Sequence, residues 1–183
     1  QSLSNLIIPL VFFQIWDSVF RFSFDYEDNK DKFKVINNGF IVMQVGMIIY
    51  ALGFWIVSTI FPFKHKILIF LYSLGIGFQY FYSVIARSLQ DNSLFVLSGC
   101  INSAISIILN VVLIAIYDRG VESLYISSIV GIFAQVLVIN HKIKPLNKLH
   151  LKDIEFNIIK KYIRFSAPLS ISTVSQWLLS GFT

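Results

Sequence analysis

Long uncharged apolar runs, each about as long as a bilayer crossing, follow one another along this chain and are separated by short charged segments. A transmembrane helix needs roughly 20 mostly apolar residues to cross the hydrocarbon core. By this measure the sequence predicts an all-α integral membrane protein. We expect five complete crossings and the start of another, near residues 3–23, 37–60, 67–86, 94–116 and 122–140, and from 165 onward.

The basic residues gather at every second junction between these runs. Of the 15 Lys and Arg residues, only Lys64, Lys66 and Arg119 lie in the junctions after the second and fourth crossings. By the positive-inside rule, the junctions after the first, third and fifth crossings are then cytoplasmic. The same segregation explains the net charge of +5, so we interpret the basic balance as membrane topology and expect no nucleic-acid partner.

This topology predicts three parts of a longer protein. Residues 1–140 would hold the five crossings, residues 141–164 a cytoplasmic amphipathic linker, and residues 165–183 the truncated start of the next crossing. The chain would begin outside, which suggests one further helix before it. In the linker, apolar residues recur at helical spacing and the basic residues lie elsewhere, so we expect contact with anionic membrane lipids. A plain connection between two bundles and a specific lipid sensor both fit that pattern.

Polar residues inside the crossings mark the candidate site. Asp17 and Arg21 are spaced i, i+4 at the cytoplasmic end of the first crossing, and Gln79, Ser83 and Arg87 share one face of the third. Ionisable residues in a membrane segment are functional candidates by default. The two stripes would meet at the same depth and line a cytoplasm-facing cavity, where the arginines hold a diphosphate by bidentate hydrogen bonds. The alternative is an ordinary ion pair at the interface, with Arg87 reaching lipid phosphates.

The fourth crossing carries a stripe of small and polar residues on an otherwise aliphatic helix. Its members with amide or hydroxyl groups include Asn102, Ser106 and Asn110. Such stripes let helices approach closely and hydrogen-bond each other, and they also line lumens, so both roles remain open. The fifth crossing repeats the pattern more weakly, through Ser128, Gly131 and Gln135.

Several chemistries are not expected. The single Cys100 lies mid-membrane, and the three histidines are dispersed over junctions on both sides, so we expect neither a disulfide within the chain nor a metal or other cofactor. The predicted outer junctions are a few residues long, and no HExxH or GxSxG pattern occurs, which argues against an enzyme such as a membrane-embedded polymerase.

Three stretches carry a family resemblance: IWDSVFRFSFDYEDNKDKF, FYSVIARSLQDNSLFVLSGCINSAISIILNVVLIAIYDRGVESLYISSIVG and YIRFSAPLSISTVSQWL. They resemble the polysaccharide flippases of the multidrug/oligosaccharidyl-lipid/polysaccharide exporter superfamily. Asp17 and Arg21 match that family's acidic and basic pair, and Arg87 its Ala-Arg before a cytoplasmic turn. Asn102 and Asn110 match its asparagines of the fourth crossing. The chain departs from the pattern at Ser88, Ile171 and Gln176, where the family often has Gly, Pro and an aromatic residue.

The resemblance implies an N-terminal six-helix bundle lacking its first helix, and the start of the second bundle of an alternating-access transporter. The expected function is translocation of an undecaprenyl diphosphate-linked oligosaccharide across the bacterial cytoplasmic membrane, for surface polysaccharide such as O-antigen or capsule. Glycosyltransferases and a polymerase of that pathway would be partners. The expected substrate-binding residues are Arg21, Arg87, Gln79 and Ser83, with Asp17 orienting Arg21 or coupling an ion. A multidrug antiporter of the same superfamily is the alternative; its cationic substrates would favour more acidic residues than the single Asp17.

Overall fold

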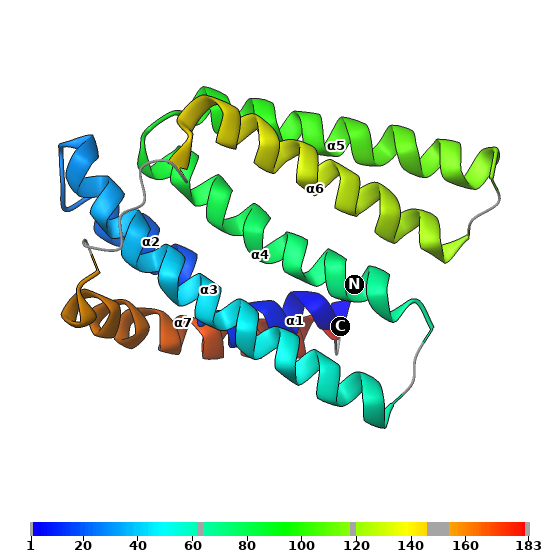
Figure 1. Cartoon of the computed structure of the whole chain (residues 1–183), viewed down its shortest axis with the longest axis horizontal. Helices are drawn as coiled ribbons and strands as arrows, with labels where there is room; N and C mark the ends of the chain where they lie inside the picture. The colour runs from blue at the N-terminus through cyan, green and yellow to red at the C-terminus, as the bar shows by residue number, and fades with distance from the viewer. Residues whose placement is uncertain (1, 62–63, 118–119, 146–153, 182–183) are drawn as a thin grey trace. The chain divides into compact units, whose positions relative to one another are not determined.

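The computed structural model describes residues 2–61, 64–117, 120–145 and 154–181, and these residues form seven helices and no strand. In chain order (Figure 1), the helices are α1 (Ser2–Val11), α2 (Ile15–Ser23), α3 (Asn29–Ile60), α4 (Lys66–Ser88), α5 (Asn92–Ala115), α6 (Val121–Ile143) and α7 (Phe156–Gly181).

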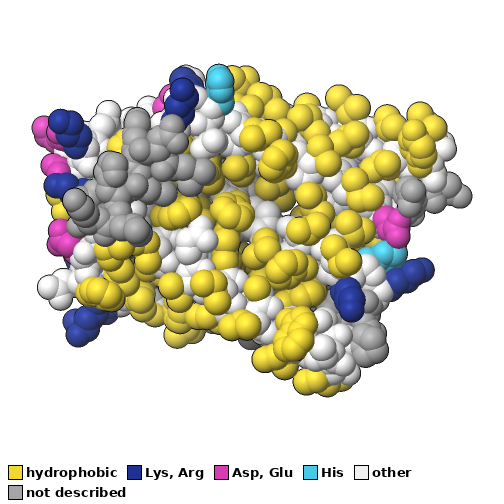
Figure 2. All heavy atoms as spheres, in the orientation of Figure 1, with side chains coloured by type: hydrophobic (Ala, Val, Ile, Leu, Met, Phe, Trp, Pro, Cys, Tyr) yellow, Lys and Arg dark blue, Asp and Glu magenta, His cyan; other side chains and the backbone are white. Residues whose placement is uncertain are grey.

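Four of the described helices, α3 to α6, are long and apolar enough to cross a membrane. At 1.5 Å per residue, the 23 residues of α4 or of α6 extend about 35 Å, against a hydrocarbon core of about 30 Å. In α5 only Leu94 and Ser98 are buried, and its outer face exposes residues such as Ile107 and Ile108. Figure 2 shows hydrophobic side chains covering much of the visible surface. A surface of this kind suits lipid rather than water, so the chain is a membrane protein.

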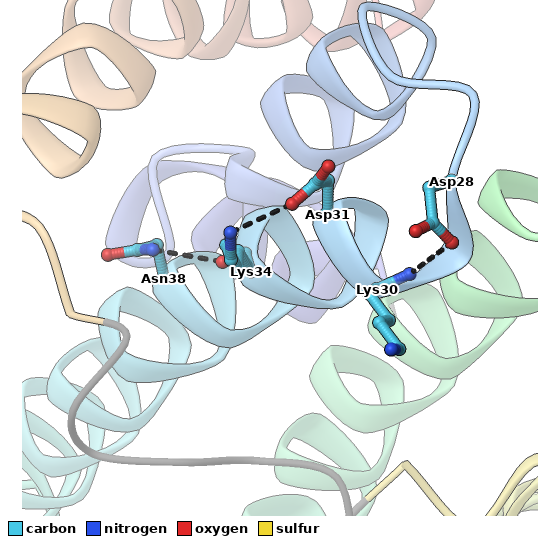
Figure 3. A network of polar contacts seen from close by, with 5 residues as sticks. All are labelled: Asp28, Lys30, Asp31, Lys34 and Asn38. Atoms are coloured by element: carbon cyan, nitrogen blue, oxygen red, sulfur yellow. Dashed lines mark hydrogen bonds and ion pairs between the residues drawn. The ribbon is translucent and has the colours of Figure 1, made fainter.

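These four helices coincide with the expected crossings from the second to the fifth, but α3 begins eight residues before the expected residue 37. The early start has a local cause. Lys34 pairs with Asp31 at 2.8 Å, and the Asn38 side-chain amide donates to the Lys34 carbonyl at 2.9 Å (Figure 3). Side chains three and four residues apart are neighbours on a helix, so these contacts extend α3 through its charged first turns.

The expected single crossing over residues 3–23 requires a correction, because the structure has two helices there. At the end of α1, the N–H of Gln14 donates to Pro9 O at 2.9 Å and that of Phe13 to Leu10 O at 3.2 Å. Those two bonds are the Schellman pattern that closes a helix C-terminus. Phe13 and Gln14 both have φ of 49°, a conformation usually taken by glycine. Because neither residue is Gly, the break could not be predicted from residue type.

The expected boundary between a linker and a new crossing at residues 164 and 165 also requires a correction. Helix α7 runs without interruption from Phe156 to Gly181, and Pro168 lies inside it. Residues 146–153 of the expected amphipathic linker lie outside the described residues. Just before α7, the backbone N–H of Glu155 donates to the Asn38 side chain of α3 at 2.8 Å.

The chain divides into two compact units. Unit 1 comprises Gln1–Leu52 and Asn147–Thr183, and unit 2 comprises Gly53–Leu146. In unit 1, α7 packs against α1 and α2. In unit 2, α6 packs against both α4 and α5, and the three helices lie side by side (Figure 1).

Candidate functional site

A network of uncharged polar side chains joins the three helices of unit 2, and Gln135 of α6 is at its centre. The Gln135 carboxamide oxygen accepts from Gln79 Nε2 of α4 at 3.1 Å and from Asn102 Nδ2 of α5 at 2.9 Å. Its nitrogen donates to Ser83 Oγ of α4 at 3.0 Å. Gln135 is 3% exposed, so one buried carboxamide bonds to both neighbouring helices.

The network continues along α5. Ser106 Oγ lies 3.2 Å from the Asn102 side-chain oxygen and 3.3 Å from the Ser127 carbonyl of α6, and can donate to either. Gly131 of α6 makes this approach possible. A Cβ at Gly131 would overlap the Ser106 hydroxyl and the Asn102 side-chain oxygen, and would lie 2.8 Å from the Asn102 carbonyl. The backbones of α5 and α6 therefore touch where the polar groups meet, as at small-residue helix contacts in membranes.

Local helix geometry explains why these residues converge. Gln79 and Ser83 are four residues apart on α4, as are Asn102 and Ser106 on α5, so each pair lies on one face of its helix. In an apolar bundle an unpaired amide costs several kcal/mol. The helices accordingly turn their polar faces toward one another, and Gln135 provides the acceptor and donor that the two pairs share.

Three buried polar atoms in the described part of the chain have no hydrogen-bond partner: Asn110 Oδ1, Asn140 Oδ1 and Ser88 Oγ. Asn110 follows Ser106 by four residues on α5 and so extends the polar stripe past the network. Unsatisfied buried acceptors in a native fold often indicate water or a ligand. Asn110 is thus the member of the predicted stripe whose side-chain oxygen accepts no hydrogen bond from the described residues.

A polar contact between side chains of different elements lies at each end of unit 2. At one end, His65 Nδ1 before α4 lies 3.0 Å from Glu122 Oε1 at the start of α6. At the other, Lys142 Nζ near the end of α6 lies 2.8 Å from Asp91 Oδ2, and the Asp91 side chain also caps α5 by accepting from Leu94 N. The hydrogen bond from Lys142, then that from Leu94, holds the pKa of the Asp91 carboxyl below its ordinary value. Neither pair could be predicted from the sequence, because each joins residues far apart in the chain.

We call the second of these ends the basic end of unit 2. It carries Arg87, Lys142 and Lys144 against one carboxylate of the unit's described residues, Asp91. The Arg87 guanidinium is exposed at the last turn of α4 and lies 5.5 Å from the centre of the Phe95 ring of α5.

The remaining predicted residues lie in unit 1. The Arg21 guanidinium pairs with the carboxylate of Asp25, four residues further along the chain, at 2.8 Å. Both side chains of this pair are about half exposed, so water still hydrates their charges. Asp17 lies in the first turn of α2 and is partly buried. The predicted meeting of the Asp17 and Arg21 stripe with that of α4 stays a prediction, because it joins two units that the structure describes separately.

Beside Arg21, an aromatic cluster fixes α2 to α7. The Phe22 ring stacks on Tyr162 at 5.2 Å between centroids, and the Lys161 ammonium lies 4.2 Å from the centre of the same ring. Ser18 Oγ donates to the Tyr162 carbonyl at 2.8 Å. These residues were missed as a group, although alternating aromatic and basic residues near residue 162 were the available signal.

The structure thus brings Gln79, Ser83, Asn102 and Ser106 into one network, places Asn110 further along the same stripe, and puts Arg87 at the basic end of unit 2. Among the residues described, no group of three or more His, Cys, Asp or Glu side chains could hold a metal ion. No family model, curated protein or solved structure matches the chain.

Proposed function

We propose that this protein translocates a lipid-linked oligosaccharide of the undecaprenyl diphosphate type across the bacterial cytoplasmic membrane. The supporting observation is the division of polar chemistry in unit 2: uncharged amides and hydroxyls within the bundle, and exposed cations at one end. Amides and hydroxyls complement sugar hydroxyls, and arginine complements a diphosphate. The resemblance to polysaccharide flippases adds the substrate class.

The distribution of acidic residues favours this substrate over a cationic drug. In the four membrane-length helices, the acidic residues are Asp31 in the first turns of α3 and Glu122 in the first turn of α6. The remaining candidate acid, Asp17, lies on α2. A cation pathway through α4, α5 and α6 would therefore lack a carboxylate at mid-membrane depth, whereas a neutral sugar needs none.

The test is complementation of a flippase-deleted strain with the full-length gene, measuring surface polysaccharide per amount of membrane protein. Arg87→Lys should reduce polysaccharide about tenfold at normal protein abundance, because an ammonium cannot reproduce the planar fork that binds a diphosphate. Arg164→Lys, the same change at an exposed residue of α7, is the matched control and should be silent. Full activity of Arg87→Lys would remove Arg87 from the substrate site.

A second variant tests whether a polar residue within the bundle, Asn110, contributes to transport. Asn110→Leu removes the acceptor that has no partner in the structure, so it should preserve abundance and lower transport. A loss of abundance with unchanged transport per molecule would instead assign Asn110 to helix packing.

A further inference from the structure

A groove of about 660 Å³ lies at the basic end of unit 2, between the start of α5 and the end of α6. This volume lies in the range of small-molecule sites. The groove is amphipathic along the helix axes. Ser93, His141 and Lys142 line its polar end, and Leu97 and Leu137 lie one turn deeper in their helices.

We propose that this groove binds an anionic glycerophospholipid of the surrounding membrane, with the phosphate at Lys142 and His141 and one acyl chain along Leu97 and Leu137. The site is distinct from the amide network of Gln135. It depends on α5 and α6 crossing a membrane, and it does not depend on the proposed transport function.

The charge at this end complements a phosphodiester. Within the described part of unit 2, three cationic residues and one carboxylate, Asp91, lie here. Lys142 reaches Asp91 at 2.8 Å while its side chain stays 59% exposed, so the ammonium has room for a second oxygen ligand. An ammonium has three donors. Basic pockets between helices at the cytoplasmic face of membranes are suited to anionic lipid headgroups.

The apolar part of the groove is suited to an acyl chain. Leu97 of α5 and Leu137 of α6 are 57% and 49% exposed, and Val96 beside Leu97 is exposed as well. Leu97 follows Ser93 by four residues, so it lies about 6 Å deeper along the axis. A bound lipid would therefore place its headgroup at the charged end of the groove and its acyl chain along the apolar residues one turn deeper.

The groove fits other occupants less well. Its lining has one hydroxyl and no carboxamide, which offers little to an oligosaccharide. Its excess of cations disfavours both a metal ion and the basic end of a second copy. An anionic lipid satisfies the charge and the apolar surface together.

The experiment measures lipid binding to the purified full chain in mild detergent, by native mass spectrometry, with phosphatidylglycerol and phosphatidylcholine as probes. The wild-type chain should bind phosphatidylglycerol more tightly than phosphatidylcholine. Asp91→Asn/Lys142→Gln, which keeps the local net charge and a capping residue, should bind phosphatidylglycerol roughly fivefold more weakly, because the phosphate loses its direct contact with the Lys142 ammonium. Phosphatidylcholine binding should not change.

Three further variants separate the contributions of the ion pair, the charge and the groove to lipid binding. Asp91→Asn alone frees Lys142 and should bind phosphatidylglycerol more tightly than wild type, whereas a purely structural ion pair predicts no gain. Lys66→Gln removes one charge at the opposite end of unit 2 and should have no effect. Leu97→Trp fills the groove and should weaken both lipids. Equal binding of the two lipids by wild type, or unchanged binding by Leu97→Trp, would overturn the proposal and favour another occupant, such as a segment of this chain.

Discussion

Units 1 and 2 hold their helices together in different ways. In unit 2, three continuous helices share side-chain hydrogen bonds through one buried carboxamide, Gln135. In unit 1, the broken helix formed by α1 and α2 packs on α7 through stacked aromatic rings. Gly46 of α3 has no side chain, which lets the break at Phe12 approach α3 closely. The first arrangement follows from the spacing of polar residues along straight helices. The second depends on backbone conformation, which spacing does not record.

The largest effect should come from the closest helix contact in unit 2. Gly131→Val would place a side chain against Asn102 and Ser106 of α5, and should lower the free energy of unfolding by about 3 kcal/mol. The measurement is unfolding of the purified protein in detergent titrated with dodecyl sulfate. Gly99→Val is the matched control, because a Cβ at Gly99 has nothing within 4 Å. Equal losses for both variants would contradict the close approach.

Removing the shared carboxamide should have the next largest effect. Gln135→Leu keeps much of the volume but leaves Gln79, Ser83 and Asn102 without their common partner. We expect a loss of about 2 kcal/mol for three hydrogen bonds, given about 0.6 kcal/mol for a typical interhelical bond in a membrane. Gln176→Leu on α7, where the side chain is exposed, should change stability little in the same titration. A neutral Gln135→Leu would show that the network does not hold the three helices together.

Unit 1 should respond in the opposite sense to a glycine at its helix break. Phe13 has φ of 49° and is 41% exposed, so Phe13→Gly relieves a strained conformation and should stabilise the fold by about 1 kcal/mol. Leu10 is similarly exposed but lies within α1, so Leu10→Gly should destabilise by about 1 kcal/mol. If both variants lose stability alike, the backbone at residue 13 is helical and residues 3–23 form one helix after all.

The contrast between residue spacing and backbone conformation also explains how much could be predicted from the sequence. Apolar run length located α3 to α6, and four-residue spacing found Gln79 with Ser83 and Asn102 with Ser106. Which helix faces meet is a tertiary property, so the central role of Gln135 and the pairing of Asp91 with Lys142 did not follow from spacing. The break after α1 was missed because no Gly or Asn marks its left-handed residues.

The smallest effect concerns pH and the basic end of unit 2. The pKa of Asp91 is lowered in the folded protein, so its pairing contributes stability above the ordinary value of 3.8 and loses it as pH falls through the lowered pKa. Wild type should therefore have a slightly higher Tm than Asp91→Asn near pH 6, and the difference should shrink below pH 3.8. A difference that persists or grows in acid would reverse the assigned sign.

The central claim is that α4, α5 and α6 cross a membrane with the basic end of unit 2 in the cytoplasm, and cysteine labelling in intact cells tests it most directly. In a Cys100→Ala background, Lys64→Cys should react with a membrane-impermeant thiol reagent. Asn92→Cys should react only after the membrane is permeabilised, and a permeant maleimide provides the control for thiol reactivity. Labelling of Asn92→Cys with protection of Lys64→Cys would invert the topology, and labelling of both in intact cells would contradict the crossing itself.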